Sequence, residues 1–156
     1  ERWELRRDAL FLSGNDINLA QAMALAEVTK PDTSIAVVGA GTIPYFLPDC
    51  RTIDIMGKMD PVIAHGPVRP PMSLEDITFL RPGYENIMRP GHMKWDYART
   101  FGELQPDVIV SIWEGTTEEA APYLKNYVYA VVGEGVKVYL KKDSPNVLWD
   151  KVIIKN

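Results

Sequence analysis

Five titratable side chains that could do chemistry lie in two short segments of the sequence. Asp54, Asp60 and His65 lie in TIDIMGKMDPVIAH, and His92 and Asp96 lie in GHMKWDY. Carboxylates and imidazoles in this combination can bind a hard or borderline metal ion. They can also act as a general acid and base. The same residue types cap helices and order turns, so each of the five has a structural alternative.

Three of these residues fit structural roles well. Asp60 directly precedes Pro61, and this pair is typical of the N-cap and first residue of a helix. His65 falls in the last turn of that helix, where a cation is stabilising. Asp96 is expected in a first helical turn, where negative charge is favoured. Because the spacing matches no known metal motif, we expect structural roles and no metal site.

For Asp54 and for the residues that follow Gly91, both a structural and a functional role remain open. Asp54 is a carboxylate inside a predicted inner strand, so it must be hydrogen-bonded, paired or at the mouth of a site. Backbone N–H groups of the following MGKMD loop are its expected partners. His92 and Lys94 follow Gly91 at a loop-to-helix junction, where an imidazole could transfer protons or bind a sugar hydroxyl or phosphate. A histidine bonded to backbone is the favoured alternative.

The remaining chemical signals are weak. The turn VVGAGTIP has Gly39 and Gly41 but lacks the third glycine of a dinucleotide fingerprint, so we expect no NAD, FAD or other cofactor. Cys50 is the only cysteine, which excludes a cysteine-based zinc site. Four aromatic residues could stack on carbohydrate but are expected in the core: Tyr84, Trp95, Tyr97 and Trp113.

Composition favours one globular domain over residues 1–156. Apolar residues make up 46% of the chain and charged residues 24%, as in ordinary folded domains. The net charge of -4, without a run of basic residues, argues against a nucleic-acid partner. The apolar runs are too short to cross a membrane. Because the chain opens on ERWELRRDAL with no initiator Met, we expect it to be a fragment of a longer protein.

The elements expected to position these residues alternate between helices and strands. A helix is predicted over 17–30, capped by Asn15 or Asp16, with one buried face formed by Ile17, Ala20, Leu25 and Val28. A buried strand follows over 34–41, and then a short helix with Thr42 as its N-cap. Further strands are predicted over 51–56 and 106–113, with a helix over 93–105 between them.

The C-terminal part of the sequence predicts a hairpin. Thr116 and Glu119 have the spacing of a capping box, and strands over 127–133 and 136–142 flank the turn GEG. A last strand is predicted over 151–156. Six of the twelve prolines lie between Gly57 and Gly91, where a short helix is predicted over 73–80. The expected fold is three-layer α/β: a mostly parallel sheet, helices on both faces, and an antiparallel C-terminal hairpin edge.

Three motifs in a fixed order carry a family resemblance. An A-G-x-I-P-Y turn is formed by Ala40, Gly41, Ile43, Pro44 and Tyr45. A D-x-x-G-x-x-D-P-x-I-A segment is formed by Asp54, Gly57, Asp60, Pro61, Ile63 and Ala64. A P-G-H-x-K-x-D segment is formed by Pro90, Gly91, His92, Lys94 and Asp96, before a strand opened by Pro106 and Asp107. With the preceding helix and strand, the motifs span residues 17 to 112.

This set resembles the extracytoplasmic C-terminal domain of polytopic glycosyltransferases of the GT-C type. These are bacterial membrane proteins that take sugar from polyprenyl-phosphate donors, and they include arabinofuranosyl- and mannosyltransferase-like proteins. The resemblance places the catalytic carboxylate in an early loop between membrane helices, outside this chain. It therefore implies a non-catalytic accessory domain of a cell-membrane protein, on the extracytoplasmic side.

The partners implied are the membrane-embedded part of the same polypeptide and a glycan acceptor or polyprenyl-phosphate sugar. Candidate binding or motif residues are Tyr45, Asp54, Asp60, His65, His92, Lys94 and Asp96. Two alternatives stay open. One is a free-standing small α/β enzyme with a site around Asp54 and His92, and the other is a structural or interaction module.

Overall fold

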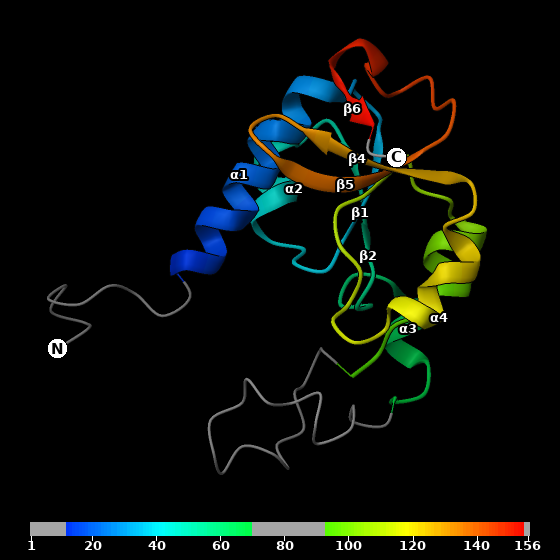
Figure 1. The fold of residues 1–156 in the computed structure, drawn as a ribbon. Coiled ribbons are helices and arrows are strands. Elements are labelled where there is room, and N and C mark those ends of the chain that lie inside the picture. The colour runs from blue at the N-terminus through cyan, green and yellow to red at the C-terminus, as the bar shows by residue number, and fades with distance from the viewer. Residues whose placement is uncertain (1–11, 70–92, 155–156) are drawn as a thin grey trace, which may run out of the picture.

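The fold is built on one six-stranded mixed sheet with the strand order β2-β1-β3-β5-β4-β6 (Figure 1). The structure is a computed structural model that describes residues 12–69 and 93–154. The helix predicted over 73–80, and also Tyr84 and His92, lie outside the described residues. None of the described helices combines the length and apolar character needed to span a membrane.

The first half of the sheet is parallel. β1 (Ser34–Val37) lies between β2 (Arg51–Asp54) and β3 (Val108–Ile109) and pairs with both in parallel. All four residues of β1 are buried, as expected for a β-branched run covered on both faces. The three strands confirm the α/β alternation that the sequence predicts.

The second half of the sheet is antiparallel. β4 (Tyr127–Val132) and β5 (Val136–Lys141) form the predicted hairpin, and β5 pairs with β3. β6 (Ile153–Ile154) pairs with the other side of β4, so β6 is the outermost strand. The prediction of a mostly parallel sheet is therefore wrong for the described strands. The short GEG turn makes β5 antiparallel to β4, and β3 and β6 then pair antiparallel with the two outer sides of this hairpin.

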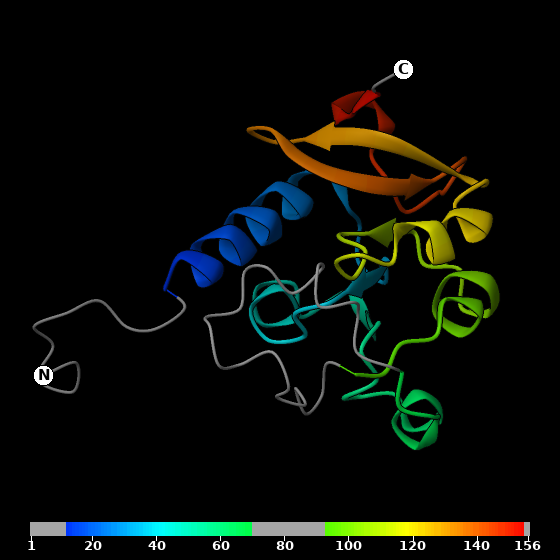
Figure 2. The ribbon, with the colours of Figure 1, turned by 60° about the horizontal axis from the view of Figure 1, so that its bottom comes forward.

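Helices surround this sheet (Figures 1 and 2). The α-helices are α1 (Leu12–Val28), α2 (Thr42–Phe46), α3 (Pro61–His65) and α4 (Thr117–Ala120). The others are a π-helix, η1 (Ala98–Glu103), and two 3-10 helices, η2 (Ala121–Tyr123) and η3 (Trp149–Lys151).

The buried side chains form two clusters, and successive residues of a strand belong to different clusters. Ile35 and Val37 of β1 pack with α1 and α2, whereas Ala36 packs in the second cluster with Phe101 of η1 and Ala120 of α4. Because neighbouring strand residues point to opposite faces, the two clusters lie on opposite sides of the sheet. Figure 2 shows α1 and α2 on one side and η1 and α4 on the other.

The predicted N-terminus of the first helix is wrong. α1 begins at Leu12, so Asn15 and Asp16 lie inside the helix instead of capping it. Of the expected buried face, Leu25 and Val28 are in the core, but Ile17 is 61% exposed and Ala20 is also exposed. The buried residues are concentrated in the C-terminal half of α1, because only that half packs on the sheet.

At two other predicted helix N-termini, the structure differs from the predicted capping interaction. Gly41 is the N-cap of α2, so Thr42 is its first residue. Thr116 precedes α4 but makes no side-chain cap bond. Its hydroxyl bonds to the Trp113 carbonyl at 2.7 Å and to the Tyr97 hydroxyl at 2.6 Å. One local partner, the Trp113 carbonyl, and one tertiary partner, the Tyr97 hydroxyl, have replaced the predicted capping box.

Asp107 joins three separate parts of the chain at the amino ends of β1 and β3. Its carboxylate accepts the Ser34 N–H at 2.9 Å and the Ser34 hydroxyl at 2.8 Å. It also accepts the Ser144 hydroxyl at 2.7 Å and the Asn146 amide at 3.1 Å. Burial alone would raise the pKa of Asp107, but these hydrogen bonds outweigh it and hold the pKa below its ordinary value.

We expect the stabilisation from Asp107 to disappear in acid. A carboxyl with a depressed folded pKa stabilises fully above its unfolded pKa of about 3.9, and less as the pH falls through the folded value. Urea unfolding of wild type and Asp107→Asn, between about pH 3 and about pH 7, checks this. The difference in unfolding free energy should narrow below about pH 4. A difference that stays constant with pH would contradict the assignment.

Candidate functional site

Asp54 lies at the carboxyl end of β2 and is only 2% exposed. Its Oδ1 accepts the Met56 N–H at 2.9 Å, and its Oδ2 accepts the Met59 N–H at 2.8 Å. The predicted hydrogen bonds to the MGKMD loop are thus confirmed. Both carboxylate oxygens are used to order the turn between β2 and α3.

Gly57 gives this turn its shape. Its φ of +70° is in the left-handed region, where glycine is favoured. A Cβ on Gly57 would lie 2.6 Å from the Cβ of Ile63, a buried residue of α3. The turn therefore depends on both the Asp54 carboxylate and the absence of a side chain at Gly57.

Asp60 is the N-cap of α3, as predicted. Its Oδ1 accepts the Val62 N–H at 2.8 Å and the Ile63 N–H at 3.3 Å. Its Oδ2 pairs with Nε of Arg99 at 3.3 Å. The carboxylate therefore caps one helix and ties it to η1.

The C-terminal end of α3 is held by Lys94. Its Nζ donates to the carbonyl of Ala64, where a cation also meets the helix dipole favourably. His65 is the exposed last residue of α3, as predicted. Lys94 and Asp60 thus stabilise the two ends of the same short helix.

Asp96 stands directly before the helical turn that leads into η1. Its Oδ1 accepts the Arg99 N–H at 2.9 Å, and its carbonyl accepts the Thr100 N–H at 2.9 Å. This is the helix N-terminal role expected for Asp96. The helix itself is shorter than the predicted 93–105, because residues 93–96 are used to reach α3 and the core.

A clasp formed by Arg69, Trp95 and Glu119 lies beside these residues. The Arg69 guanidinium pairs with Glu119 at 2.9 Å and lies 5.4 Å from the centre of the Trp95 ring. The Trp95 indole N–H donates to Glu119 at 3.0 Å. The Arg69 N–H also donates to the Met93 carbonyl at 2.7 Å, so residues 69 and 93 lie together.

The core interpretation is confirmed for two of the aromatic residues. Trp95 is 8% exposed and Tyr97 is 1% exposed. The Tyr97 hydroxyl accepts the Trp113 N–H at 3.1 Å, and burial raises its pKa. Trp113 is half-buried. Tyr45, by contrast, is 78% exposed on α2, with its ring edge-on to Phe46.

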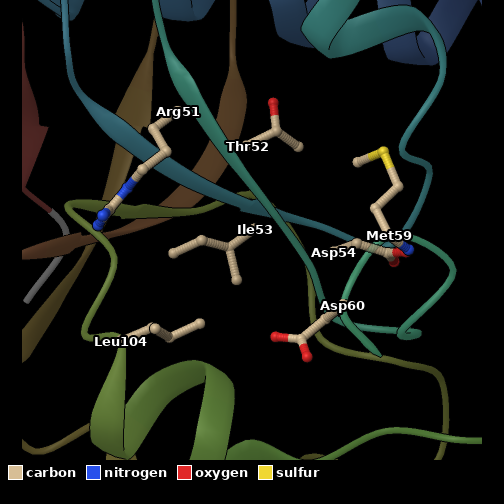
Figure 3. Close-up of a pocket in the computed structure, with 7 residues that line it drawn as sticks. All are labelled: Arg51, Thr52, Ile53, Asp54, Met59, Asp60 and Leu104. Atoms are coloured by element: carbon tan, nitrogen blue, oxygen red, sulfur yellow. The ribbon is translucent and has the colours of Figure 1, made fainter. Parts of the chain in front are cut away.

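A small cleft lies along the outer side of β2 (Figure 3). Its volume is ≈ 180 Å³, below the roughly 300–1,000 Å³ of pockets that hold drug-sized ligands. Its lining residues are Arg51, Thr52, Ile53, Asp54, Met59, Asp60 and Leu104. Asp54 and Asp60 are the predicted site residues that the structure brings to this cleft.

The described residues do not combine into a metal centre, since no three His, Cys, Asp or Glu side chains among them are grouped to hold an ion. The carboxylates of Asp54, Asp60 and Asp96 all accept backbone N–H groups. What this arrangement can do is hold α3 and η1 in a defined position next to the cleft.

Sequence reasoning missed Arg69 and Arg99, and it gave Asp107 and Glu119 only local roles, at the start of a strand and in a capping box. Arg99 has one local signal, because Glu103 lies four residues later and pairs with it. The partners of the other three are at least 24 residues away in sequence. No local pattern identifies such a partner.

Comparison with known proteins gives one match. A family model described as a domain of unknown function (DUF8728) matches residues 9–147. No curated protein matches the chain. No solved structure matches it either.

Proposed function

The chain belongs to the family described as a domain of unknown function (DUF8728), and from its structure and motifs we propose that it is a non-catalytic accessory domain of a membrane glycosyltransferase. One observation carries the proposal. Among the described residues, the charged side chains of the D-x-x-G-x-x-D-P-x-I-A and P-G-H-x-K-x-D segments bind backbone groups in or next to α3 and η1 instead of converging on a reaction centre. Asp60 and Lys94, one from each motif, hold the two ends of α3.

The geometry supports a framework role for these motifs. Asp54 orders the turn before α3, and Arg99 connects α3 to η1 through Asp60. Both oxygens of Asp54 are occupied by backbone N–H groups. A general base needs an oxygen within hydrogen-bond reach of substrate, so this arrangement favours a structural carboxylate.

The location and the partners that we propose for the domain follow from its resemblance to GT-C type glycosyltransferases. The domain would lie on the extracytoplasmic side of the cell membrane, contacting the membrane-embedded part of the same polypeptide, a glycan acceptor or a polyprenyl-phosphate sugar. We also class the fold as three-layer α/β with an antiparallel C-terminal side. This class is supported by the two buried clusters on opposite faces of the sheet and by the β4–β5 hairpin.

The first test concerns the full-length protein. We expect Arg99→Ala to lower the unfolding free energy of the domain, because it breaks the pair with Asp60 that ties α3 to η1. The rate of sugar transfer by the full-length protein should fall in proportion to the fraction of the domain that is folded. Glu103→Ala is the control, since it removes only the exposed partner of Arg99 and should change neither quantity by much.

Three outcomes would contradict the proposal. One is sugar transfer or glycosidase turnover by the purified 156-residue chain alone. Another is a full-length reading frame without hydrophobic spans. The third is an Arg99→Ala protein that transfers no sugar although its domain unfolds like wild type, because that would place Arg99 in a reaction site.

A further inference from the structure

We propose that the outer side of β2 binds an extended polypeptide segment that carries an acidic side chain. β2 is the last strand at its end of the sheet, so among residues 12–69 and 93–154 it has a neighbouring strand only on the β1 side. The cleft of ≈ 180 Å³ lies along this free side (Figure 3). This binding does not depend on the proposed glycosyltransferase role.

The backbone of Thr52 supplies the hydrogen-bonding groups. The Arg51 N–H donates to the Thr33 carbonyl at 2.9 Å, and the Ile55 N–H donates to the Val37 carbonyl at 3.0 Å. Alternate residues of a strand direct their N–H and C=O groups to opposite sides. Thr52 therefore directs both groups away from β1. An N–H and C=O pair of this kind at a sheet edge is the template that an added strand uses.

Apolar side chains beside this edge provide a surface for the side chains of the bound segment. Ile53 is 6% exposed, Leu104 is half-buried and Met59 is 56% exposed, and all three line the cleft. Figure 3 shows Arg51, Ile53 and Leu104 on one side of β2 and Thr52 on the other. In an added strand, alternate side chains would lie over Ile53 and Leu104.

The charge in the cleft selects an acidic segment. Arg51 is exposed, and its guanidinium has no ion pair within the described part of the chain. Asp60, in contrast, is already paired with Arg99. Asp54, the other carboxylate of the lining, is only 2% exposed, and its two oxygens accept the Met56 and Met59 N–H groups, so Arg51 is the exposed charge that a bound segment would meet. A glutamate or aspartate next to Arg51 in the bound segment would complete an ion pair there.

The experiment uses two capped pentapeptides, Val-Glu-Val-Thr-Val and the same peptide with Lys in place of Glu. Each is titrated into the isotope-labelled 156-residue chain, and the backbone amide signals are followed by NMR. We expect saturable shifts at Thr52 and its neighbours, with the Glu peptide binding about three-fold more tightly or better. Arg51→Glu should reverse this preference, because it exchanges the sign of the charge at an exposed position.

Two substitutions of Thr52 distinguish binding through backbone hydrogen bonds to β2 from binding through side-chain charge alone. Thr52→Pro removes the outward N–H without removing a hydrogen bond of the sheet, and edge strands tolerate proline where the N–H is not used by the sheet. Thr52→Val is the matched control, because it keeps the N–H. We expect Thr52→Pro to abolish peptide binding and Thr52→Val to retain it. If Thr52→Pro does not fold, the charge reversal by Arg51→Glu decides the question.

The proposal is overturned if neither peptide gives saturable shifts on β2, or if Thr52→Pro folds and binds like wild type. It is also overturned if inorganic phosphate shifts the β2 amides while the peptides do not, because the edge would then be an anion site. If the Arg51→Glu protein still prefers the Glu peptide to the Lys peptide, an ion pair between Arg51 and the peptide is also excluded.

Discussion

Replacement of Gly57 by alanine is expected to destabilise the domain strongly. Two costs add at this position. An L-residue at φ +70° costs about 1–2 kcal/mol. A new Cβ pressed against the Ile63 side chain costs about 1–3 kcal/mol more, because the buried α3 residue has to move. We therefore expect urea unfolding of Gly57→Ala to show a loss of about 2–5 kcal/mol.

Two other glycines serve as matched controls. Gly135 has φ +106°, but a Cβ there would meet nothing within 4 Å, so Gly135→Ala measures the backbone cost alone. Gly41 has φ -102° and also has nothing within 4 Å. Gly41→Ala should cost less than about 1 kcal/mol. If Gly57→Ala is no more destabilising than Gly135→Ala, contact with Ile63 does not shape the turn.

Removal of the Asp54 carboxylate is the second large expected effect. In Asp54→Ala the buried Met56 N–H loses its acceptor, at a cost of about 1–3 kcal/mol. The Met59 N–H is less buried and can bond to water instead. Asp54→Asn keeps one acceptor oxygen but presents a donor to the second N–H, so it should recover only part of the loss.

Thermal or urea unfolding of wild type and both Asp54 variants measures this effect. Asp49→Ala is the control, because Asp49 is an exposed carboxylate near the start of β2 whose loss should be nearly neutral. The sugar-transfer activity proposed for the full-length protein is measured on the same variants. If both Asp54 variants unfold like wild type while transfer collapses, Asp54 belongs to a functional site and its structural assignment is wrong.

Features that depend on a few neighbouring residues could be predicted from the sequence. Asp60 caps α3 because its acceptor lies two and three residues from the N–H groups it bonds. The β4–β5 hairpin follows from two runs rich in β-branched and aromatic residues around GEG, with Gly133 and Gly135 at positive φ. Burial of β1 on both faces follows from its unbroken apolar run.

Features that depend on distant partners could not be predicted. Thr116 has the local pattern of a cap, but the hydroxyl of Tyr97, 19 residues away, competes for its side chain. Local propensity contributes about 1 kcal/mol at such positions, so one tertiary contact is enough to override it.

For this protein, the sequence by itself determined the kinds of element, their order and the residues available to cap or turn them, since these depend on contacts within about four residues. Only the tertiary structure decided that Asp60 meets Arg99, that Asp107 joins Ser34 to Ser144, and that β2 is left at the edge beside the cleft. These contacts bridge 37 to 73 residues of chain. Packing of the whole core holds such residues together, so no local pattern can encode the pairing.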